Sequence, residues 1–400
     1  MPGGWQNVRI LQLHTRYREQ GGEDAVVRAE ADLLRRRGHE VVQHQIRNPA
    51  DAAGAAMALV LAPWNPLEVR SVRDIAERTQ PDVVHVHNTW YAMSPAVLWT
   101  LRRAGVPVVV TLHNFRSLCA NAQLFRDGAP CEDCVGSHPW HGVRHRCYRG
   151  SALLSVPSAG TIALHRRLGT WERCVDLLLV LNEFARARFV RGGLPARRIR
   201  VKPNFVADPG PRSMPVSKSR TVLYVGRISP EKGVDILVEA WRRIAAKTTL
   251  ELVIIGDGAS RAELERRSPP GIRFEGHLQA ARVQERMRGA RALVLPSIWY
   301  EGQPMVVLEA LAAGLPVLAS RTGGMPDLLA PVGREWLVPP GVVEALAGSL
   351  RELEEPERVE EGSRRARACF EEAFTEASAA DALEGAYRWA KGRAMGTADA

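Results

Sequence analysis

Short apolar runs alternate with stretches of helical periodicity along most of this chain. Residues 83–86 and 106–112 are almost entirely apolar and rich in Val, which is typical of parallel strands buried on both faces. In residues 25–37 the apolar positions recur every three or four residues and Gly38 follows, which predicts a helix that ends there. The first half of the chain therefore predicts one open α/β sheet. Its expected strands are residues 8–13, 41–46, 83–86, 106–112, 176–181 and 199–201, with further helices at residues 94–104 and 183–192.

A segment of different character follows this first half. Residues 203–220 read PNFVADPGPRSMPVSKSR, with four prolines and no periodicity, and are predicted to form a linker. The alternation then restarts, and residues 342–353 and 357–389 form a charged C-terminal part with helical periodicity. We therefore predict a second doubly wound sheet. Its expected strands are residues 221–225, 250–255, 272–274, 292–295 and 316–319, with helices at residues 234–246 and 305–313.

The expected fold is thus α/β, with two Rossmann-like doubly wound domains in tandem. Ligands of such sheets bind beyond the carboxyl ends of the strands, so two sheets facing each other across a cleft would suit a ligand with two parts. The predicted organisation is an N-terminal domain at residues 1–203 with a Cys-rich insertion at 115–150, a linker at 204–220, a second domain at 221–373, and a C-terminal helix and tail at 374–400.

Charge narrows the classes of ligand. The 400 residues include 54 Lys or Arg and 44 Asp or Glu, which gives a formal net charge of +10. Such a surplus fits phosphorylated ligands, nucleic acid or an anionic membrane surface. Aromatic residues are only 6% of the chain, which argues against a protein that stacks single-stranded bases.

The sequence also predicts where the protein resides. No apolar run approaches the ~18 residues of a membrane-spanning helix, and the N-terminal residues lack the basic start and long apolar core of a signal peptide. A cytoplasmic protein is therefore expected, with cysteines that are reduced or metal-bound. Basic residues 144–149 and 166–167 flank apolar residues 153–164, which suits peripheral contact with the inner face of a membrane, while a solvated or packed helix is the simpler alternative.

One basic loop is placed to bind a diphosphate. Residues 223–233 read LYVGRISPEKG, so that an apolar strand ends at Gly226 and a helix follows Gly233. Unpaired N–H groups and the positive end of the helix dipole lie in such a loop, and Arg227 and Lys232 add two cations. The alternative is a solvated basic loop.

A second loop carries two carboxylates. Residues 299–311 read WYEGQPMVVLEAL, with Gly and Pro between Glu301 and the expected helix that holds Glu309. Carboxylates accept hydrogen bonds from paired sugar hydroxyls well, because they offer several lone pairs. Two glutamates eight residues apart are also common by chance. Two further glycine loops follow strands, IIGDG at residues 254–258 and TGGMPD at residues 322–327.

These motifs, in this order, resemble the family 4 retaining glycosyltransferases (glycosyl transferases group 1), which have the two-domain GT-B fold. The most specific part is EGQPMVVLEALAAGLPVLAS at residues 301–320, followed by GGMPDLL at residues 323–329. VGRISPEKG, IIGDG and the N-terminal segments HNTW and TLHN match as well. The resemblance covers nearly the whole chain and implies a C-terminal helix that crosses back to the first domain.

The resemblance also implies roles for individual residues of the donor site. Arg227 and Lys232 match the basic pair that holds the donor diphosphate, Glu309 matches the glutamate that takes the nucleotide ribose hydroxyls, and Glu301 matches the one that faces the transferred sugar. The other donor-binding positions implied are Gly21, Gly22, Gly226, Asp257, Gly258, Gly302, Gln303, Pro304 and Met305.

Histidines of the first domain complete the implied site. His113 in VTLHN matches a histidine that helps to position the transferred sugar, although a hydrogen-bonded histidine that caps a strand is the alternative. His87 and Asn88 end another strand and are expected on the acceptor side, unless they serve the core and a cap.

The resemblance further implies the reaction. A sugar from a UDP-, GDP- or ADP-sugar donor is transferred with retention to a hydroxyl of a saccharide, lipid-linked or small-molecule acceptor, in polysaccharide or glycoconjugate biosynthesis. No metal or other cofactor is expected for catalysis, because Arg227, Lys232 and helix termini neutralise the leaving diphosphate. A front-face route also needs no carboxylate nucleophile.

Four cysteines depart from the minimal family pattern. Cys119, Cys131, Cys134 and Cys147 are spaced C-x11-C-x2-C-x12-C within a basic, His-rich segment. One C-x2-C pair is half of a zinc signature, and the flanking cysteines complete four ligands of a structural zinc site. Buried reduced thiols and disulfides remain alternatives.

Other classes of protein fit less well. A nucleotide-sugar epimerase of GT-B shape is the alternative enzyme, and it would need acid and base residues around the sugar. No G-x-G-x-x-G follows the first strand as in a dehydrogenase, and no P-loop sequence occurs. No nucleic-acid-binding motif is visible either, so no nucleic-acid partner is expected.

Overall fold

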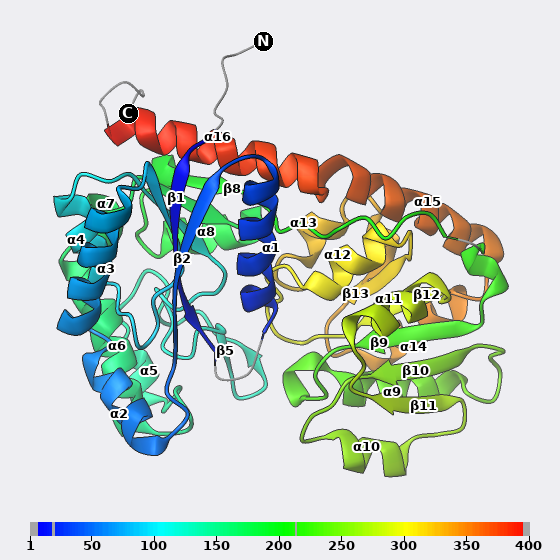
Figure 1. Ribbon diagram of the computed structural model, residues 1–400. Helices are drawn as coiled ribbons and strands as arrows, with labels where there is room; N and C mark the ends of the chain where they lie inside the picture. Colours follow the sequence, from blue (N-terminus) through cyan, green and yellow to red (C-terminus); the bar gives the residue numbers. More distant parts are fainter. Residues whose placement is uncertain (1–6, 18–20, 213, 395–400) are drawn as a thin grey trace. The chain divides into compact units, whose positions relative to one another are not determined.

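The computed structural model describes residues 7–17, 21–212 and 214–394 (Figure 1). These residues form two compact units. The first comprises the chain up to Leu124, Cys131–Lys202 and the residues from Ala379 onward, and the second comprises Phe125–Pro130 and Pro203–Ser378. Residues 18–20, which precede the predicted donor-binding Gly21, one linker residue (213) and the end of the predicted tail (395–400) lie outside the described residues.

The first unit is built on a parallel six-stranded sheet in the order β2-β1-β3-β4-β7-β8. Its central strands are buried along their whole length, as the apolar runs predict. The strands are β1 (Arg9–Arg16), β2 (Glu40–Arg47), β3 (Val83–Asn88), β4 (Val108–Leu112), β7 (Leu177–Val180) and β8 (Ile199–Val201). A short antiparallel hairpin consists of β5 (Phe125–Arg126) and β6 (Ala129–Pro130).

Helices α2 (Ala52–Leu61) and α3 (Pro66–Thr79) of the first unit were not expected from the sequence. Helix α2 has small or apolar side chains on every face, so no periodic stripe marks it. The side chain of Asp51 accepts a hydrogen bond at its N-terminus, and Asn65 followed by Pro66 starts α3. The other helices are α1 (Gly22–Arg36), α4 (Val97–Arg103), α5 (His141–Arg144), α6 (Ala152–Arg167), α7 (Thr170–Arg173) and α8 (Glu183–Arg191).

The second unit has a parallel six-stranded sheet in the order β11-β10-β9-β12-β13-β14. The predicted strands all form, and β14 is added at the edge. The strands are β9 (Thr221–Val225), β10 (Glu251–Ile255), β11 (Ile272–Gly276), β12 (Ala292–Leu295), β13 (Val317–Ser320) and β14 (Leu337–Val338). The helices are α9 (Val234–Ile244), α10 (Arg261–Arg267), α11 (Ala280–Arg288), α12 (Met305–Ala312), α13 (Met325–Leu329), α14 (Val343–Glu352) and α15 (Pro356–Ala373).

The C-terminal helix α16 (Glu376–Ala394) returns to the first unit, as predicted. Its residues Leu383, Tyr387 and Ala390 are buried in one core cluster with Val8 and Ile10 of the first unit. The sequence showed helical periodicity over residues 357–389 and placed the start of the C-terminal helix at residue 374; in the structure α15 ends at Ala373 and α16 begins at Glu376. The hydroxyl of Thr375 accepts a hydrogen bond from the amide of Ser378 at 3.2 Å, which caps the new helix. The two helices are the orange and red ribbons of Figure 1.

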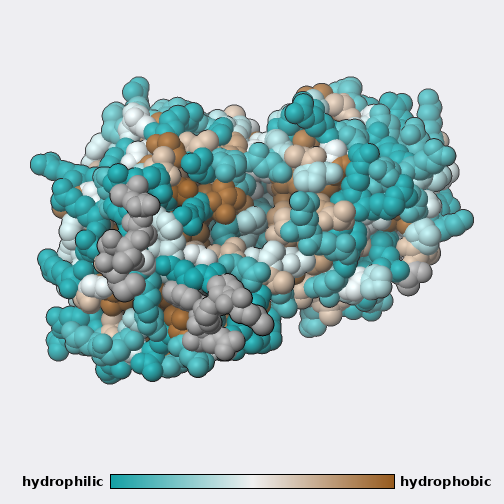
Figure 2. Space-filling model, turned by 90° about the horizontal axis from the view of Figure 1, so that it is seen from above, coloured by the Kyte–Doolittle hydropathy of each residue, from teal (hydrophilic) through white to brown (hydrophobic). Residues whose placement is uncertain are grey.

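The described helices include none that is long and apolar enough to cross a lipid bilayer. The face in Figure 2 is mostly hydrophilic, with smaller hydrophobic areas between the polar side chains. Apolar residues gather instead in the cores around the two sheets.

Each sheet has one point at which the strand order reverses. It lies between β1 and β3 in the first unit, and between β9 and β12 in the second. Loops that leave the carboxyl ends of the two strands diverge there and open a crevice for ligands. The loops after β9 and β12 are those that carry the basic pair and Glu301 of the sequence analysis.

Candidate functional site

The loop after β9 is fixed by its contact with the segment after β12. Gly233 has φ +67, and a Cβ built on it would lie 2.2 Å from the carbonyl oxygen of Pro296, so only glycine fits. The hydroxyl of Tyr224 donates a hydrogen bond of 2.6 Å to the carbonyl oxygen of Arg227. The loops that follow β9 and β12 therefore contact each other through their backbones.

Lys232 and Glu301 form an ion pair between these loops. Lys232 Nζ lies 2.7 Å from Glu301 Oε1, and the hydroxyl of Ser297 donates to the same oxygen at 2.6 Å. Lys232 Nζ also lies 4.8 Å from the centre of the Trp299 ring. Burial raises the pKa of Glu301, but the ammonium of Lys232 and these hydrogen bonds lower it more, so the net pKa lies below its ordinary value. Glu301 is therefore ionised and Lys232 is held in place at neutral pH.

Arg227 lies on the same loop but is far more exposed than Lys232. Its side chain is 63% exposed, against 14% for Lys232. The guanidinium lies 3.2 Å from a carboxylate oxygen of Glu231, to which the hydroxyl of Ser229 also donates. The two predicted cations thus share a loop, but only Lys232 is held within the protein.

Glu309 has the environment of a ligand-binding carboxylate. It is half-buried on α12, and within the described residues its carboxylate makes no hydrogen bond or ion pair. Burial raises its pKa. At Gly302, just before α12, a Cβ would meet no atom within 4 Å, so the backbone there borders open space. Hydroxyl groups of a ligand would satisfy this carboxylate.

Other predicted donor residues serve the protein itself. Gln303 Oε1 accepts a hydrogen bond of 2.6 Å from the amide of Asn204, and Pro304 is the N-cap residue of α12, directly before Met305. Asp257 accepts from the amide of Gly258 at 2.8 Å. A Cβ on Gly256 would lie 1.8 Å from the carbonyl oxygen of Gly226, so the loops after β9 and β10 are in direct contact.

In the first unit, His87 and His113 are brought together at the ends of β3 and β4. His87 Nδ1 lies 3.1 Å from His113 Nε2, and the other ring nitrogen lies 3.0 Å from Gln12 Nε2. Burial lowers the pKa of both histidines well below the ordinary value, so both rings are neutral. Asn88 uses its side chain on the backbone, donating to the carbonyl oxygen of Thr15 and accepting from the amide of Trp90.

A buried ion pair lies beside these histidines and was missed by sequence reasoning. The ammonium of Lys202 contacts the carboxylate of Glu30, and both side chains are almost fully buried. A Glu30 oxygen also lies 3.6 Å from His87 Nε2 and 3.8 Å from His85 Nδ1. Glu30, His85 and His87 are close enough to share a metal ion, but Lys202 already supplies the cation that this carboxylate needs. The only hint in the sequence is a charged residue inside the apolar stripe of α1.

The N-terminus of α1 holds a second unexpected polar group. Gly21 caps the helix, and its amide donates to Asp24, which also contacts His14 Nε2 at 2.7 Å. The hydroxyl of Tyr17 donates to Glu23 at 3.0 Å, and burial raises the pKa of Glu23 to about 8. A Cβ on Gly21 would meet no atom within 4 Å, so this loop, which continues into Gly22, is open on that side.

The fold gathers the four cysteines of the insertion. Burial, together with the neighbouring thiols of Cys119, Cys147 and Cys131, raises the pKa of Cys134 to about 12. No three cysteine sulfurs of the described chain lie within 4.8 Å of one another, and none of the cysteines forms a disulfide. The four thiols are therefore neighbours, but their sulfur atoms are farther apart than the ligands of one tetrahedral metal ion.

Comparison with known proteins finds two matching families and several related proteins. Residues 21–204 match the family described as "Glycosyl transferase 4-like domain", and residues 219–355 match "Glycosyl transferases group 1". The chain is 29% identical to the GDP-mannose-dependent alpha-mannosyltransferase of Mycolicibacterium smegmatis, over 75% of this chain and 76% of that protein. It is 28% identical to the sulfoquinovosyl transferase SQD2 of Arabidopsis thaliana, over 72% of this chain and 52% of that protein.

Solved structures share the fold. Sucrose-phosphate synthase from Thermosynechococcus elongatus superposes with a TM-score of 0.70 at 19% identity, over 95% of this chain and 98% of that one. Anabaena HepE, in complex with UDP and glucose, superposes with a TM-score of 0.66 at 17% identity, over 95% and 99% of the two chains.

Proposed function

The chain belongs to the glycosyltransferases with the GT-B fold, and from this premise we propose that it transfers a sugar from a nucleoside diphosphate sugar to a hydroxyl acceptor with retention, as family 4 enzymes do. The observation that carries the proposal is the switch point of the second sheet. There the Lys232–Glu301 pair joins the two loops that contact each other, a Cβ on Gly302 would meet no atom within 4 Å, and Glu309 follows on helix α12. A cation for phosphate and a carboxylate for ribose hydroxyls are thus supplied by adjacent segments.

The reaction places negative charge on the leaving diphosphate. Lys232 and Arg227 supply positive charge on the loop before α9, whose N-terminus adds unpaired N–H groups. Glu301, held ionised by Lys232, is proposed to face the transferred sugar. In this scheme the protein cations neutralise the charge of the leaving diphosphate, and its departure needs no metal.

The names of the relatives indicate which nucleotides such enzymes use, but they do not agree on one base or sugar. One curated relative is named for GDP-mannose, and HepE was solved with UDP. We propose a UDP-, GDP- or ADP-sugar as donor, bound by the second unit, and a saccharide or lipid-linked acceptor bound by the first. A role at the inner face of a membrane is part of the proposal.

A panel of nucleoside diphosphates in a thermal unfolding assay tests the donor site. A ligand at about 100 times its dissociation constant stabilises the folded state by roughly 2.7 kcal/mol, so one nucleotide is expected to raise Tm clearly. Glu309→Ala is expected to reduce that shift, because the ribose hydroxyls lose their acceptor. Glu344→Ala, an exposed glutamate of the same unit, is the control and should keep the full shift. No shift with any nucleotide would contradict the proposal.

The four gathered cysteines are proposed to hold one structural zinc ion. A Zn–S bond of about 2.3 Å places tetrahedral sulfurs roughly 3.8 Å apart, so binding requires the thiols to approach and lose their protons. Elemental analysis of protein purified without added metal is expected to give about one zinc per chain. Cys134→Ser should lower Tm, whereas Cys174→Ser, at an isolated buried cysteine, should leave the zinc in place. Metal-free protein with unchanged melting in Cys134→Ser would contradict this.

A further inference from the structure

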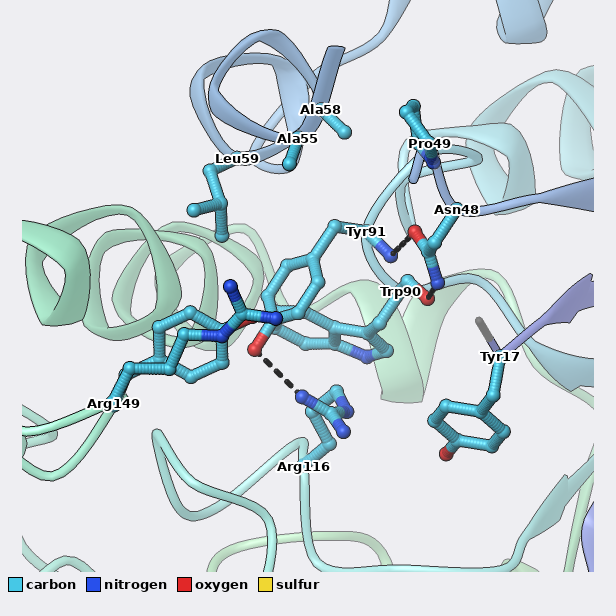
Figure 3. Close-up of a pocket in the computed structure, with 11 residues that line it drawn as sticks. Tyr17, Asn48, Pro49, Ala55, Ala58, Leu59, Trp90, Tyr91, Arg116 and Arg149 are labelled. Carbon is cyan, nitrogen blue, oxygen red and sulfur yellow. Dashed lines mark hydrogen bonds between the residues drawn. The ribbon is translucent and has the colours of Figure 1, made fainter. Parts of the chain in front are cut away.

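A pocket of about 380 Å³ lies within the first unit. Figure 3 shows Ala55, Ala58 and Leu59 of α2 turned toward the rings of Trp90 and Tyr91, which form the apolar part of its wall. The polar part of the lining includes two arginines and no carboxylate. We propose that this pocket binds an acceptor in which a phosphate group joins a saccharide to an apolar chain. The proposal rests on the proposed function and names the class of its acceptor.

Each of the two arginines that line the pocket contacts the side chain of a tyrosine. Arg116 donates one hydrogen bond of 2.6 Å to the hydroxyl of Tyr91, and its Nε is buried without a partner. The guanidinium of Arg149 lies 5.6 Å from the centre of the Tyr148 ring. Within the described part of the chain neither arginine forms an ion pair with a carboxylate. The acidic group that interacts with Arg116 is Glu23, which does not line the pocket, so Arg149 is the cation of the lining that is open to an anion. Arginine forks match phosphate oxygens.

Helix α2, which lines the pocket, is apolar on nearly all of its positions. From residue 52 to residue 67 the chain carries no charged side chain. The same helix that faces the pocket with Ala58 and Leu59 exposes Met57 and Val60 to solvent, at 58% and 67%. An apolar chain leaving the pocket along α2 therefore meets further apolar surface.

The apolar surface of α2 continues onto α6, which lies in a basic part of the chain. Helix α2 packs on α6, whose Leu153 is 80% exposed. Residues 134–171 contain no Asp or Glu but hold Arg144, Arg146, Arg149, Arg166 and Arg167. Exposed apolar side chains within a purely basic region suit an anionic lipid surface, in which the apolar part of such an acceptor resides.

The phosphate-linked apolar chain has two sources, a prenyl phosphate or a glycerophospholipid, and calorimetric titration distinguishes them. The full-length protein is titrated with farnesyl phosphate, with dihexanoyl phosphatidic acid and with farnesol, in the presence of excess nucleoside diphosphate that fills the diphosphate site of the second unit. We expect one of the two phosphates to bind, and farnesol to bind at least tenfold more weakly. The phosphate that binds identifies the source.

Two variants tie the binding to this pocket. Arg149→Gln removes the exposed cation, and Ala58→Trp fills the apolar wall, and each is expected to weaken the bound phosphate at least tenfold. Arg144→Gln removes an exposed arginine that does not line the pocket, and is expected to leave the affinity unchanged.

The outcomes separate this inference from the donor proposal. The pocket assignment is overturned if neither phosphate binds. It is also overturned if Arg149→Gln and Ala58→Trp bind the phosphate as tightly as the unchanged protein does. Both conclusions hold whether or not the nucleotide binds. Failure of every nucleoside diphosphate to bind overturns the proposed function instead.

Discussion

Lys232→Ala is expected to lower kcat by about 10²-fold or more while weakening donor binding much less. Negative charge grows on the diphosphate as the glycosidic bond breaks, and Lys232 is the less exposed of the two cations on the donor loop. Removal of this cation therefore destabilises the transition state more than the ground state. Steady-state kinetics over a range of donor concentrations measure the two effects separately.

Variants with matched charge sharpen this test. Lys218→Ala removes an exposed lysine of the same unit and is expected to leave kcat unchanged. Arg227→Ala should act in the same direction as Lys232→Ala, and Glu309→Ala should mainly weaken donor binding, because ribose contacts are alike in ground and transition states. Circular dichroism confirms folding of each variant. If Lys232→Ala keeps a near-normal kcat and only Glu309→Ala is inactive, the diphosphate assignment is wrong and the epimerase alternative gains support.

The architecture was largely predictable because both sheets are parallel. Strands buried on both faces are continuous apolar runs, so that β9 and β12 appear in the sequence with the bounds they have in the structure. Helix α2 was not predictable in this way, because a helix whose positions are nearly all apolar or small has no period to detect. Periodicity alone does not mark the break before α16, which is capped by Thr375, and the resemblance to the family suggested the separate C-terminal helix.

The candidate site was predictable only as far as its residues lie in loops with local signals. Arg227, Lys232 and Glu301 follow strands and are flanked by glycines, so their places at one switch point follow from the order of the strands. Lys202 and Glu30 are 172 positions apart, and no local pattern couples them. The pocket beside Tyr91 likewise combines separate segments, and its position depends on helix α2.

That buried pair leads to the largest stability effect we expect. Lys202→Met leaves the Glu30 carboxylate buried without its cation and is expected to destabilise the first unit by about 3–5 kcal/mol. His85, which also faces Glu30, supplies no positive charge near neutral pH while Lys202 is present, because burial lowers its pKa to about 4. Urea titration and calorimetry of the full chain measure the loss.

Two comparisons decide whether charge pairing is the cause of this loss. Lys391→Met breaks a partly exposed pair with Asp82 in the same unit, 2.8 Å long, and should cost no more than about 1 kcal/mol. The double variant Glu30→Leu with Lys202→Met removes both charges, and is expected to recover most of the stability that Lys202→Met alone loses. A double variant as unstable as Lys202→Met would show that the lysine stem, rather than the unpaired carboxylate, determines the stability at this position. In that case removal of Lys202 would destabilise the unit by loss of packing.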